Sequence, residues 1–450
     1  MQQYTLKNST VALNEQYDVI VCGGGPAGCA AATAAAREGA KTLLLEASGM
    51  LGGMGTSGLV NAFTNIFDGI RCIHSGLCER VVKSASTQPN VMDPTYKGLL
   101  GMDFEKLKME YDRMVTEAGA DILFHSHVCG VEMKDERNID VILVANKAGL
   151  TAYKAKTFID CTGDADLYAW AGKEYLKGDE EGHLQPGTMC FVVSGIDEEG
   201  FKVMNDPYWN GEGLKKHALL HKMMAEGKYY IPDDHIVYKR IAPGTFSFNA
   251  GHVYGVDCTD PASHSWAQME GRRIAWNLKN AYTEYAPCWK NSKMMQTGAT
   301  LGVRESRRII GDYTFTVEDY LNRQSFPDEV LRGNYHIDVH EEVVGMVRDT
   351  SVIYEHYTDG ESYGVPYRVM CPRDLDNVLV AGRTMSSDRI TNGTLRIMPC
   401  CLNAGEAVGI AAKLACDMEQ VNIHKVDTQV LRKRLMEHGA YLPKLPTDTF

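Results

Sequence analysis

The N-terminal part of the chain joins a short apolar strand, a glycine-rich turn and a helix, and this combination limits the fold most strongly. Residues Tyr17–Cys22 form an apolar run that ends in the turn Gly23-Gly24-Gly25-Pro26-Ala27-Gly28, and Cys29–Arg37 continues with strong helix formers. A second apolar run, Lys41–Glu46, closes on a carboxylate. Together these segments predict a strand-helix-strand unit, and therefore an α/β fold with a parallel sheet.

The spacing of Gly23, Gly25 and Gly28 is typical of a dinucleotide-binding turn. In such a turn the first glycine allows the tight bend, the second admits a pyrophosphate to the backbone, and the third lets helix and strand close together. The helix N-terminus then faces the anion. Glu46 follows Gly28 by 18 residues, where a carboxylate would accept hydrogen bonds from ribose hydroxyls and disfavour a 2′-phosphate. We therefore prefer dinucleotide binding to an ordinary glycine-rich turn.

Composition narrows the function classes. The chain has 450 residues, a net charge of −12 and no basic run, so nucleic acid is not an expected partner. Its 13 cysteines are scattered without a C-x-x-C pair, which favours a reducing cytoplasm over a disulfide framework. The first residues lack the pattern of a secretory signal, and the apolar stretch Tyr17–Ala36 contains glycines and a proline. We therefore expect neither a leader peptide nor a membrane partner.

Three later blocks carry a family resemblance. They are Leu51-Gly-Gly-Met-Gly-Thr-Ser57, Ile159-Asp-Cys-Thr-Gly-Asp-Ala-Asp166, and Asp376–Arg383 followed by Arg396-Ile-Met-Pro-Cys400. In this order they resemble the FAD-dependent oxidoreductase family of the glutathione-reductase-type flavoproteins, whose flavin domain is related to that of the flavin-bearing component of heterodisulfide reductase. The resemblance covers roughly residues 16–416. The iron–sulfur cysteines of heterodisulfide reductase are not matched, so its cluster chemistry is not expected here.

The resemblance implies FAD as cofactor and a discontinuous architecture. A Rossmann-like FAD-binding domain with a β-meander would comprise residues 14–177 and 361–420, an inserted mixed α+β substrate domain 178–360, and a C-terminal extension 421–450. The implied cofactor-binding residues are Gly23, Gly25, Pro26, Ala27, Gly28, Glu46, Ala47, Gly52, Gly53, Met54, Thr56, Ser57, Val128, Thr162, Gly163, Asp164, Gly382, Arg383, Arg396 and Met398.

Histidines are the candidate bases. Dehydrogenation of a carbon next to a hydroxyl group needs a base for the hydroxyl proton, and histidine is suited to this near neutral pH. His340 ends a block, Tyr335–His340, that matches the family, whereas His252 in Asn249-Ala-Gly-His252 departs from it and is a candidate for substrate specificity. For each histidine the alternative is a hydrogen-bonded structural residue. Tyr367 and Arg368 are secondary candidates.

Charged residues gather in the segment from Gly302 to Arg308. Arg304 and Glu305 are candidate site residues, and a structural ion-pair network is the alternative. If the segment is helical, Arg304 and Arg308 share one face. By the resemblance, Arg396 or Arg383 would lie near the flavin, beside the first amides of a helix that Pro399–Asn403 leads into. The alternative partners of these two arginines are Asp374 and Asp388.

Several other patterns carry weaker signals. His217-x-x-x-His221 has helical spacing but lacks the glutamate and third ligand of a zinc site, so no metal is expected. His125-Ser-His127 is predicted to place both rings on one strand face. Cys400-Cys401 near a helix N-terminus could support thiol chemistry, although the resemblance predicts small packing residues there. His74 is a candidate for covalent FAD attachment, with a structural role as the favoured alternative.

The function that these features predict is an FAD-dependent oxidoreductase. It would transfer a hydride between a small polar organic substrate and non-covalently bound FAD. No second glycine-turn unit follows residue 60, so a separate small electron acceptor, rather than a dedicated NAD(P)H domain, is expected. The alternatives are a flavin-dependent C=C reductase, a flavin electron-transfer subunit that docks a partner protein, and a nucleotide-binding scaffold without chemistry. A homo-oligomer is left open.

Overall fold

A parallel sheet forms the centre of the protein, whose computed structural model describes residues 10–96, 98–205, 215–340, 357–446 and 448–450. The sheet has the strand order β21-β10-β2-β3-β6. Every residue of β2, β3 and β10 is buried, as expected for parallel strands covered on both faces. The strands are β2 (Val19–Cys22), β3 (Thr42–Leu45), β6 (Asp121–Leu123), β10 (Thr157–Asp160) and β21 (Val378–Val380). The predicted α/β fold is confirmed.

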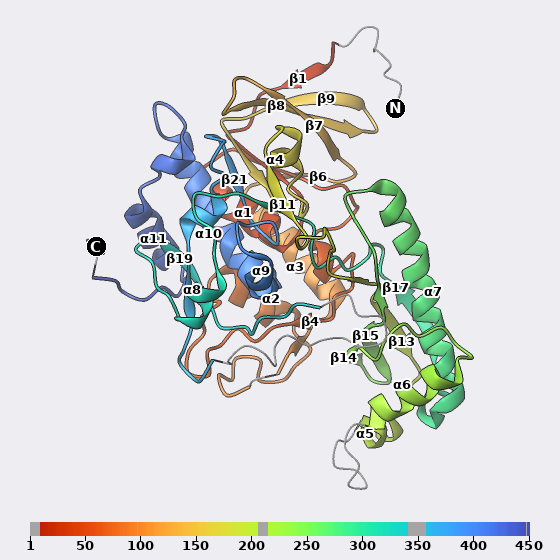
Figure 1. Cartoon of the computed structure of the whole chain (residues 1–450). Helices are drawn as coiled ribbons and strands as arrows, with labels where there is room; N and C mark the ends of the chain where they lie inside the picture. Colours follow the sequence, from red (N-terminus) through yellow and green to blue (C-terminus); the bar gives the residue numbers. More distant parts are fainter. Residues whose placement is uncertain (1–9, 97, 206–214, 341–356, 447) are drawn as a thin grey trace.

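Helices from opposite ends of the chain pack together on this sheet. Helix α1 (Pro26–Arg37) lies against α10 (Met398–Cys416), and both are rich in alanine and glycine (Figure 1). A Cβ atom on Gly405 would lie 2.1 Å from the carbonyl oxygen of Ala27, so only glycine permits this approach. Helix α10 begins at Met398, so the predicted lead-in Pro399–Asn403 is already helical. The glycine turn and the late sequence blocks are therefore neighbours in space.

An antiparallel meander lies beside the parallel sheet. It consists of β7 (His127–Met133), β8 (Ile139–Asn146) and β9 (Gly149–Lys154), with β1 (Ala12–Asn14) added parallel to β9. The prediction that His125 and His127 share a strand face is wrong. Strand β6 ends at Leu123 and joins the parallel sheet, and His125 has a φ of 50° in the connection before β7.

A second sheet with its own core lies on the right in Figure 1. Its antiparallel order is β14-β15-β13-β17, and helices α5, α6 and α7 accompany it. The buried apolar residues of this core run from Met189 to Leu301, whereas buried residues between Phe315 and Val339 join the larger core of α1 and α10. The domain boundaries predicted above stay a prediction. The elements are β13 (Phe191–Ser194), α5 (Glu198–Asn205), α6 (Lys215–Glu226), β14 (Ile236–Ala242), β15 (Thr245–Ala250), α7 (Pro261–Tyr285) and β17 (Lys293–Thr297).

Shorter elements complete the chain and connect the two cores. They are β4 (Ala62–Phe63), α2 (Leu77–Ala85), β5 (Leu100–Gly101), α3 (Phe104–Glu117), α4 (Asp166–Trp170), β11 (Tyr175–Lys177), β12 (Gly187–Thr188), β16 (His252–Val253), β18 (Arg307–Ile309), α8 (Val317–Leu321), β19 (Glu329–Gly333), β20 (Tyr363–Pro366), α9 (Arg389–Leu395) and α11 (Thr428–Glu437). Within the described part of the chain, no single helix is long and apolar enough to cross a membrane. Helices α9 and α10 meet that criterion only as a pair bent by 86°.

Candidate active site

A cavity of about 1130 Å³ opens at the carboxyl ends of the parallel strands. Its walls include Gly23 after β2, Glu46 after β3, Thr162 after β10 and Gly382 after β21. The far end is lined by residues of the second sheet and of the segment that ends at His340. Ligands of open α/β sheets bind at this edge, so the cavity is the candidate active site.

The glycine turn forms one wall of the cavity. Gly23 has a φ of 97°, and a Cβ atom on Gly28 would lie 1.8 Å from the carbonyl oxygen of Gly23. A Cβ atom on Gly25 would meet nothing within 4 Å, and Gly25 faces the cavity. Because the first amides of a helix lack partners within the helix, the N-terminus of α1 offers donors to an anion beside this open backbone.

Glu46 fixes the turn while it faces the cavity. The Gly24 amide donates to its Oε2 atom over 2.8 Å, and the Ser48 amide donates to Oε1 over 2.7 Å. A carboxylate retains lone pairs for further hydrogen bonds. Glu46 can therefore hold the loop and at the same time accept a hydrogen bond from a ligand hydroxyl.

Most of the residues predicted to bind the cofactor line this cavity. Those that do are Gly23, Gly25, Pro26, Ala27, Glu46, Ala47, Gly53, Met54, Ser57, Val128, Thr162, Gly163, Asp164, Gly382, Arg383, Arg396 and Met398. Gly28, Gly52 and Thr56 lie behind the wall. The Gly52 amide donates to the Gly24 carbonyl over 2.8 Å, and the Thr56 hydroxyl donates to the Leu51 carbonyl over 2.6 Å. These residues support the lining rather than form it.

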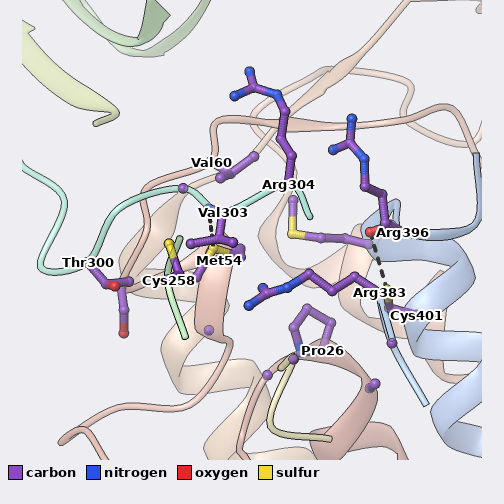
Figure 2. A pocket seen from close by; sticks show the side chains of 18 of the residues that line it. Pro26, Met54, Val60, Cys258, Thr300, Val303, Arg304, Arg383, Arg396 and Cys401 are labelled. Carbon is purple, nitrogen blue, oxygen red and sulfur yellow. Dashed lines mark hydrogen bonds between the residues drawn. The ribbon is translucent and has the colours of Figure 1, made fainter. Parts of the chain in front are cut away.

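Three arginines reach the cavity from different elements. In Figure 2, Arg383 runs to the left above Pro26, whereas Arg304 and Arg396 both extend upward. Arg383 donates from Nη2 to Asp164 Oδ1 over 2.9 Å. Arg396 donates from Nη2 to the Asp338 carbonyl over 2.7 Å and to Asp338 Oδ2 over 3.2 Å. Their carboxylate partners are therefore not the predicted alternatives, Asp374 and Asp388.

Arg304 is almost fully buried, with 7% of its surface exposed. Its Nη1 atom donates to the Pro186 carbonyl over 2.9 Å and to Thr188 Oγ1 over 2.8 Å. Burial and then the charge of Arg396 lower the pKa of Arg304 to about 10, so the side chain stays cationic at neutral pH. The surrounding segment is not the helix considered above, because Gly302 pairs with Thr188 and β18 begins at Arg307.

Glu305 points away from the cavity, although it adjoins Arg304 in sequence. Its Oε1 atom is paired with Arg308, and Oε2 lies 3.4 Å from Arg389 Nε. The Gln185 amide donates to Oε2 over 3.1 Å. Glu305 is 2% exposed and is not among the lining residues. The predicted catalytic role gives way to the alternative of a structural ion-pair network.

The two predicted histidines, His252 and His340, lie beside a third, His235, which the sequence did not single out. One ring nitrogen each of His235, His252 and His340 lies within 4.8 Å of the others. His235 and His340 line the cavity, and His252 is fully buried beside them. The Gly251 amide donates to the His235 carbonyl over 3.1 Å, where β14 and β15 pair. That pairing joins the short Asp233–His235 segment to His252, and no spacing motif signals it.

Carboxylates hold two of these rings. Nδ1 of His252 lies 3.1 Å from Asp233 Oδ2, and Nε2 of His340 lies 3.1 Å from Asp338 Oδ1. Burial lowers the pKa of His252 to about 4, and burial followed by the charge of Arg304 lowers the pKa of His340. The pKa of His235 is also held well below its usual value, first by burial and then by His252. The rings are therefore neutral near pH 7.

Three further candidates lie outside the cavity lining, namely His74, Tyr367 and Arg368. The buried His74 ring has Nδ1 2.9 Å from Asn403 Oδ1, which supports its structural alternative. Tyr367 donates its hydroxyl to the Ile423 carbonyl over 3.0 Å. Arg368 donates from Nε to Asp328 over 2.9 Å. None of these three side chains lines the cavity.

The structure also places the adjacent cysteines Cys400 and Cys401 and the predicted histidine pair. Cys400 is buried outside the cavity lining, whereas Cys401 lines the cavity. Burial raises the pKa of Cys401 to about 12, which leaves little reactive thiolate. His221 on α6 has Nε2 3.0 Å from Asp234 Oδ2. The side chain of His217 lies outside the described residues.

Comparison with known families decides the nature of the cavity. The model of the family described as FAD dependent oxidoreductase matches residues 18–435. The chain belongs to this family. It is therefore an oxidoreductase with FAD as cofactor, and the match covers the glycine turn, the histidine cluster and α10 together. A search of curated proteins gave no match.

Solved structures similar to this FAD-dependent oxidoreductase are distant in sequence. A geranylgeranyl bacteriochlorophyll reductase-like protein from Thermoplasma acidophilum has 14% identity and a TM-score of 0.49, with 95% of this chain and 84% of that chain covered. The p-nitrophenol 4-monooxygenase PnpA from Pseudomonas putida DLL-E4 has 12% identity and a TM-score of 0.47, with 98% and 88% covered.

Proposed function

We propose that this oxidoreductase transfers a hydride between a small polar organic substrate and non-covalently bound FAD. The cavity joins the glycine turn to a buried end that carries arginines and histidines, and this observation carries the proposal. Its volume of about 1130 Å³ exceeds the ~300–1,000 Å³ of ordinary ligand pockets. That size supports a cofactor and a substrate in one space.

The lining residues support this proposal at the pyrophosphate, at a ribose and at the flavin ring of FAD. The open backbone at Gly25 and the N-terminus of α1 suit the pyrophosphate, and Glu46 suits a ribose. At the other end, Arg396 and the N-terminus of α10 would stabilise negative charge at the flavin ring. Bound FAD supplies the hydride acceptor or donor. We further propose that this half is the glutathione-reductase-type domain, related to the flavin-bearing component of heterodisulfide reductase, that the sequence blocks resemble.

The buried end of the cavity suits a polar substrate. Arg304 presents a cation that would hold a carboxylate or another anionic group. The proton on His340 Nε2 is directed to Asp338, so Nδ1 keeps its lone pair and can accept a proton from a substrate hydroxyl. Burial of both side chains excludes water from the reacting groups.

The histidine environment favours dehydrogenation over the alternatives. A C=C reductase needs a side chain that carries a proton to donate, and the lowered pKa values of His252 and His340 keep both rings in the neutral, proton-accepting form near pH 7. An electron-transfer subunit needs no buried polar end beside its flavin.

The cysteines are free thiols, which supports the proposed cytoplasmic location.

Anaerobic flavin bleaching tests this function. The holoprotein is mixed with small hydroxy acids, sugar derivatives and alcohols, and we expect one of these classes to remove the flavin band at about 450 nm. Reoxidation of the photoreduced enzyme by an enoate would instead support the C=C reductase. Rapid bleaching by NADH or NADPH at the turnover rate would contradict a separate small acceptor.

A further inference from the structure

The histidine cluster contains buried ring nitrogens that have no hydrogen-bond partner among the described residues. They are Nε2 of His235, Nε2 of His252 and Nδ1 of His340. His252 is 0% exposed and His340 is 8% exposed. Ring centroids lie 4.5 Å apart for His235 and His252, 5.0 Å for His252 and His340, and 5.2 Å for His235 and His340. The three rings are thus in mutual contact.

The carboxylates determine which nitrogen of each ring is free. The Asp233 carboxylate accepts a hydrogen bond from Nδ1 of His252, and the Asp338 carboxylate accepts one from Nε2 of His340. A carboxylate is only an acceptor, so each proton stays on the bonded nitrogen and the opposite nitrogen keeps its lone pair. Carboxylates on the outer nitrogen of metal-bound histidines orient the ring and raise its basicity in the same way. Two of the rings are therefore already in the tautomer that a metal ion requires.

Asp233 also organises the rest of this shell. Its Oδ2 atom accepts from the His252 amide over 2.9 Å and from the Tyr254 hydroxyl over 3.1 Å, and its Oδ1 atom accepts from the His235 amide over 2.9 Å. One buried carboxylate thus holds the backbone of two cluster members and the ring of one. Such support limits the motion of the rings and favours a defined binding geometry.

We propose that His235, His252 and His340 bind a divalent transition-metal ion of the Zn²⁺ class at the substrate end of the cavity. Imidazole nitrogens are preferred ligands of these ions, and a site with three protein ligands leaves one position open. Bonds of about 2.0–2.1 Å require the ring nitrogens to draw together from their present spacing of up to 4.8 Å. Small side-chain rotations would have to supply this movement. The open position would face the cavity, because His235 and His340 line it.

The charges around the cluster set the strength of binding. Arg304 lies close enough to lower the pKa of all three histidines, which keeps them neutral but also repels a cation. Asp233 and Asp338 place two negative charges on the other side of the rings. Ion binding therefore depends on these carboxylates as well as on the ligands.

The inference concerns metal binding itself and requires neither the proposed substrate nor the proposed direction of reaction. With an ion bound, Nδ1 of His340 would be a metal ligand, so the role of proton acceptor proposed for it above would apply only to the metal-free enzyme. A failed substrate panel would leave the metal result intact, and an absent metal would leave the flavin result intact.

The test uses the FAD-loaded full-length protein, freed of metal with a chelator and then titrated with Zn²⁺ against a chromophoric competitor. We expect one ion per chain. X-ray absorption at the zinc edge should show nitrogen or oxygen ligands at about 2.0–2.1 Å with the outer-shell pattern of three imidazoles. This measurement needs no variant and is decisive if a variant fails to fold.

Variants locate the ion. His235→Ala and His252→Ala should each weaken Zn²⁺ binding by at least about 100-fold, and Asp233→Asn by about 10- to 100-fold, with the FAD content measured beside each. The control is His183→Ala, from the group Asp179, Glu181 and His183, in which Glu181 and His183 are exposed and which could also hold an ion. Absence of stoichiometric binding, a zinc shell without imidazole, unchanged affinity in His252→Ala, or loss of the ion in His183→Ala would each overturn the proposal.

Discussion

Gly28 packs directly against the backbone of Gly23, so closely that a methyl group on Gly28 would lie 1.8 Å from the Gly23 carbonyl oxygen. Gly25, between them, has open space where its side chain would be and faces the cavity. The glycines of one motif therefore serve different purposes. Gly28 is required by the fold of the turn, whereas Gly25 leaves room for a ligand in the cavity.

This difference predicts contrasting phenotypes. Gly25→Ala should fold with nearly wild-type stability but lose at least about 10-fold in FAD affinity, because its methyl group would occupy the path of the pyrophosphate. Gly28→Ala should lower the free energy of unfolding by about 1–3 kcal/mol through overpacking. Flavin absorbance after dialysis and urea unfolding of the apoproteins measure the two effects. Full FAD retention in Gly25→Ala would contradict the assignment of the open space.

Glu305 provides a test of structural against catalytic function. Glu305→Ala leaves Arg308 buried without its carboxylate, and loss of one partner of a buried pair costs about 3–5 kcal/mol. We expect that loss in urea unfolding, while any folded fraction keeps its KM. The matched control is Glu199→Ala, which removes an exposed pair with Lys202 and should change stability little. Wild-type stability with lost turnover would restore the catalytic interpretation of Glu305.

The cofactor half of the site was predictable because its signals are local. Gly23 to Gly28 and Glu46 lie within one strand-helix-strand unit, and each residue type is dictated by a backbone conformation or a hydrogen bond inside that unit. The contribution of α10 could be inferred only through the family resemblance, since its packing on α1 joins opposite ends of the chain.

The substrate half depends on contacts that local patterns do not record. His235 approaches His252 through pairing of β14 with β15, and His340 arrives from a segment almost 90 residues farther along. A helix would place Arg304 and Arg308 on one face, but the backbone of this segment is not helical, and Arg304 lines the cavity whereas Glu305 does not. Charge and spacing alone cannot distinguish these orientations.

The contact between Asp338 and His340 predicts a kinetic effect. Asp338→Asn removes the carboxylate that fixes the proton on His340 Nε2 and also weakens the hold on Arg396. We expect kcat to fall by about 100-fold or more, within the ~10²–10⁴ range of positioned acid–base groups. His264→Ala is the control, because His264 lines the cavity outside the cluster and should change kcat far less. Equal losses in both variants would argue against a specific role for this contact.

His74 predicts how stability depends on pH. Its buried ring has a pKa lowered to about 4 from 6.5, chiefly by burial. Between these values the unfolded chain binds more protons at this position than the folded protein, so stability falls as pH drops from 6.5 towards 4. The full shift corresponds to about 3 kcal/mol. Urea unfolding of wild type and His74→Gln at several pH values isolates this contribution from that of other groups. The stability difference between the two proteins should be greatest above pH 6.5 and shrink with acidification, whereas a constant difference would show that His74 does not titrate as its burial requires.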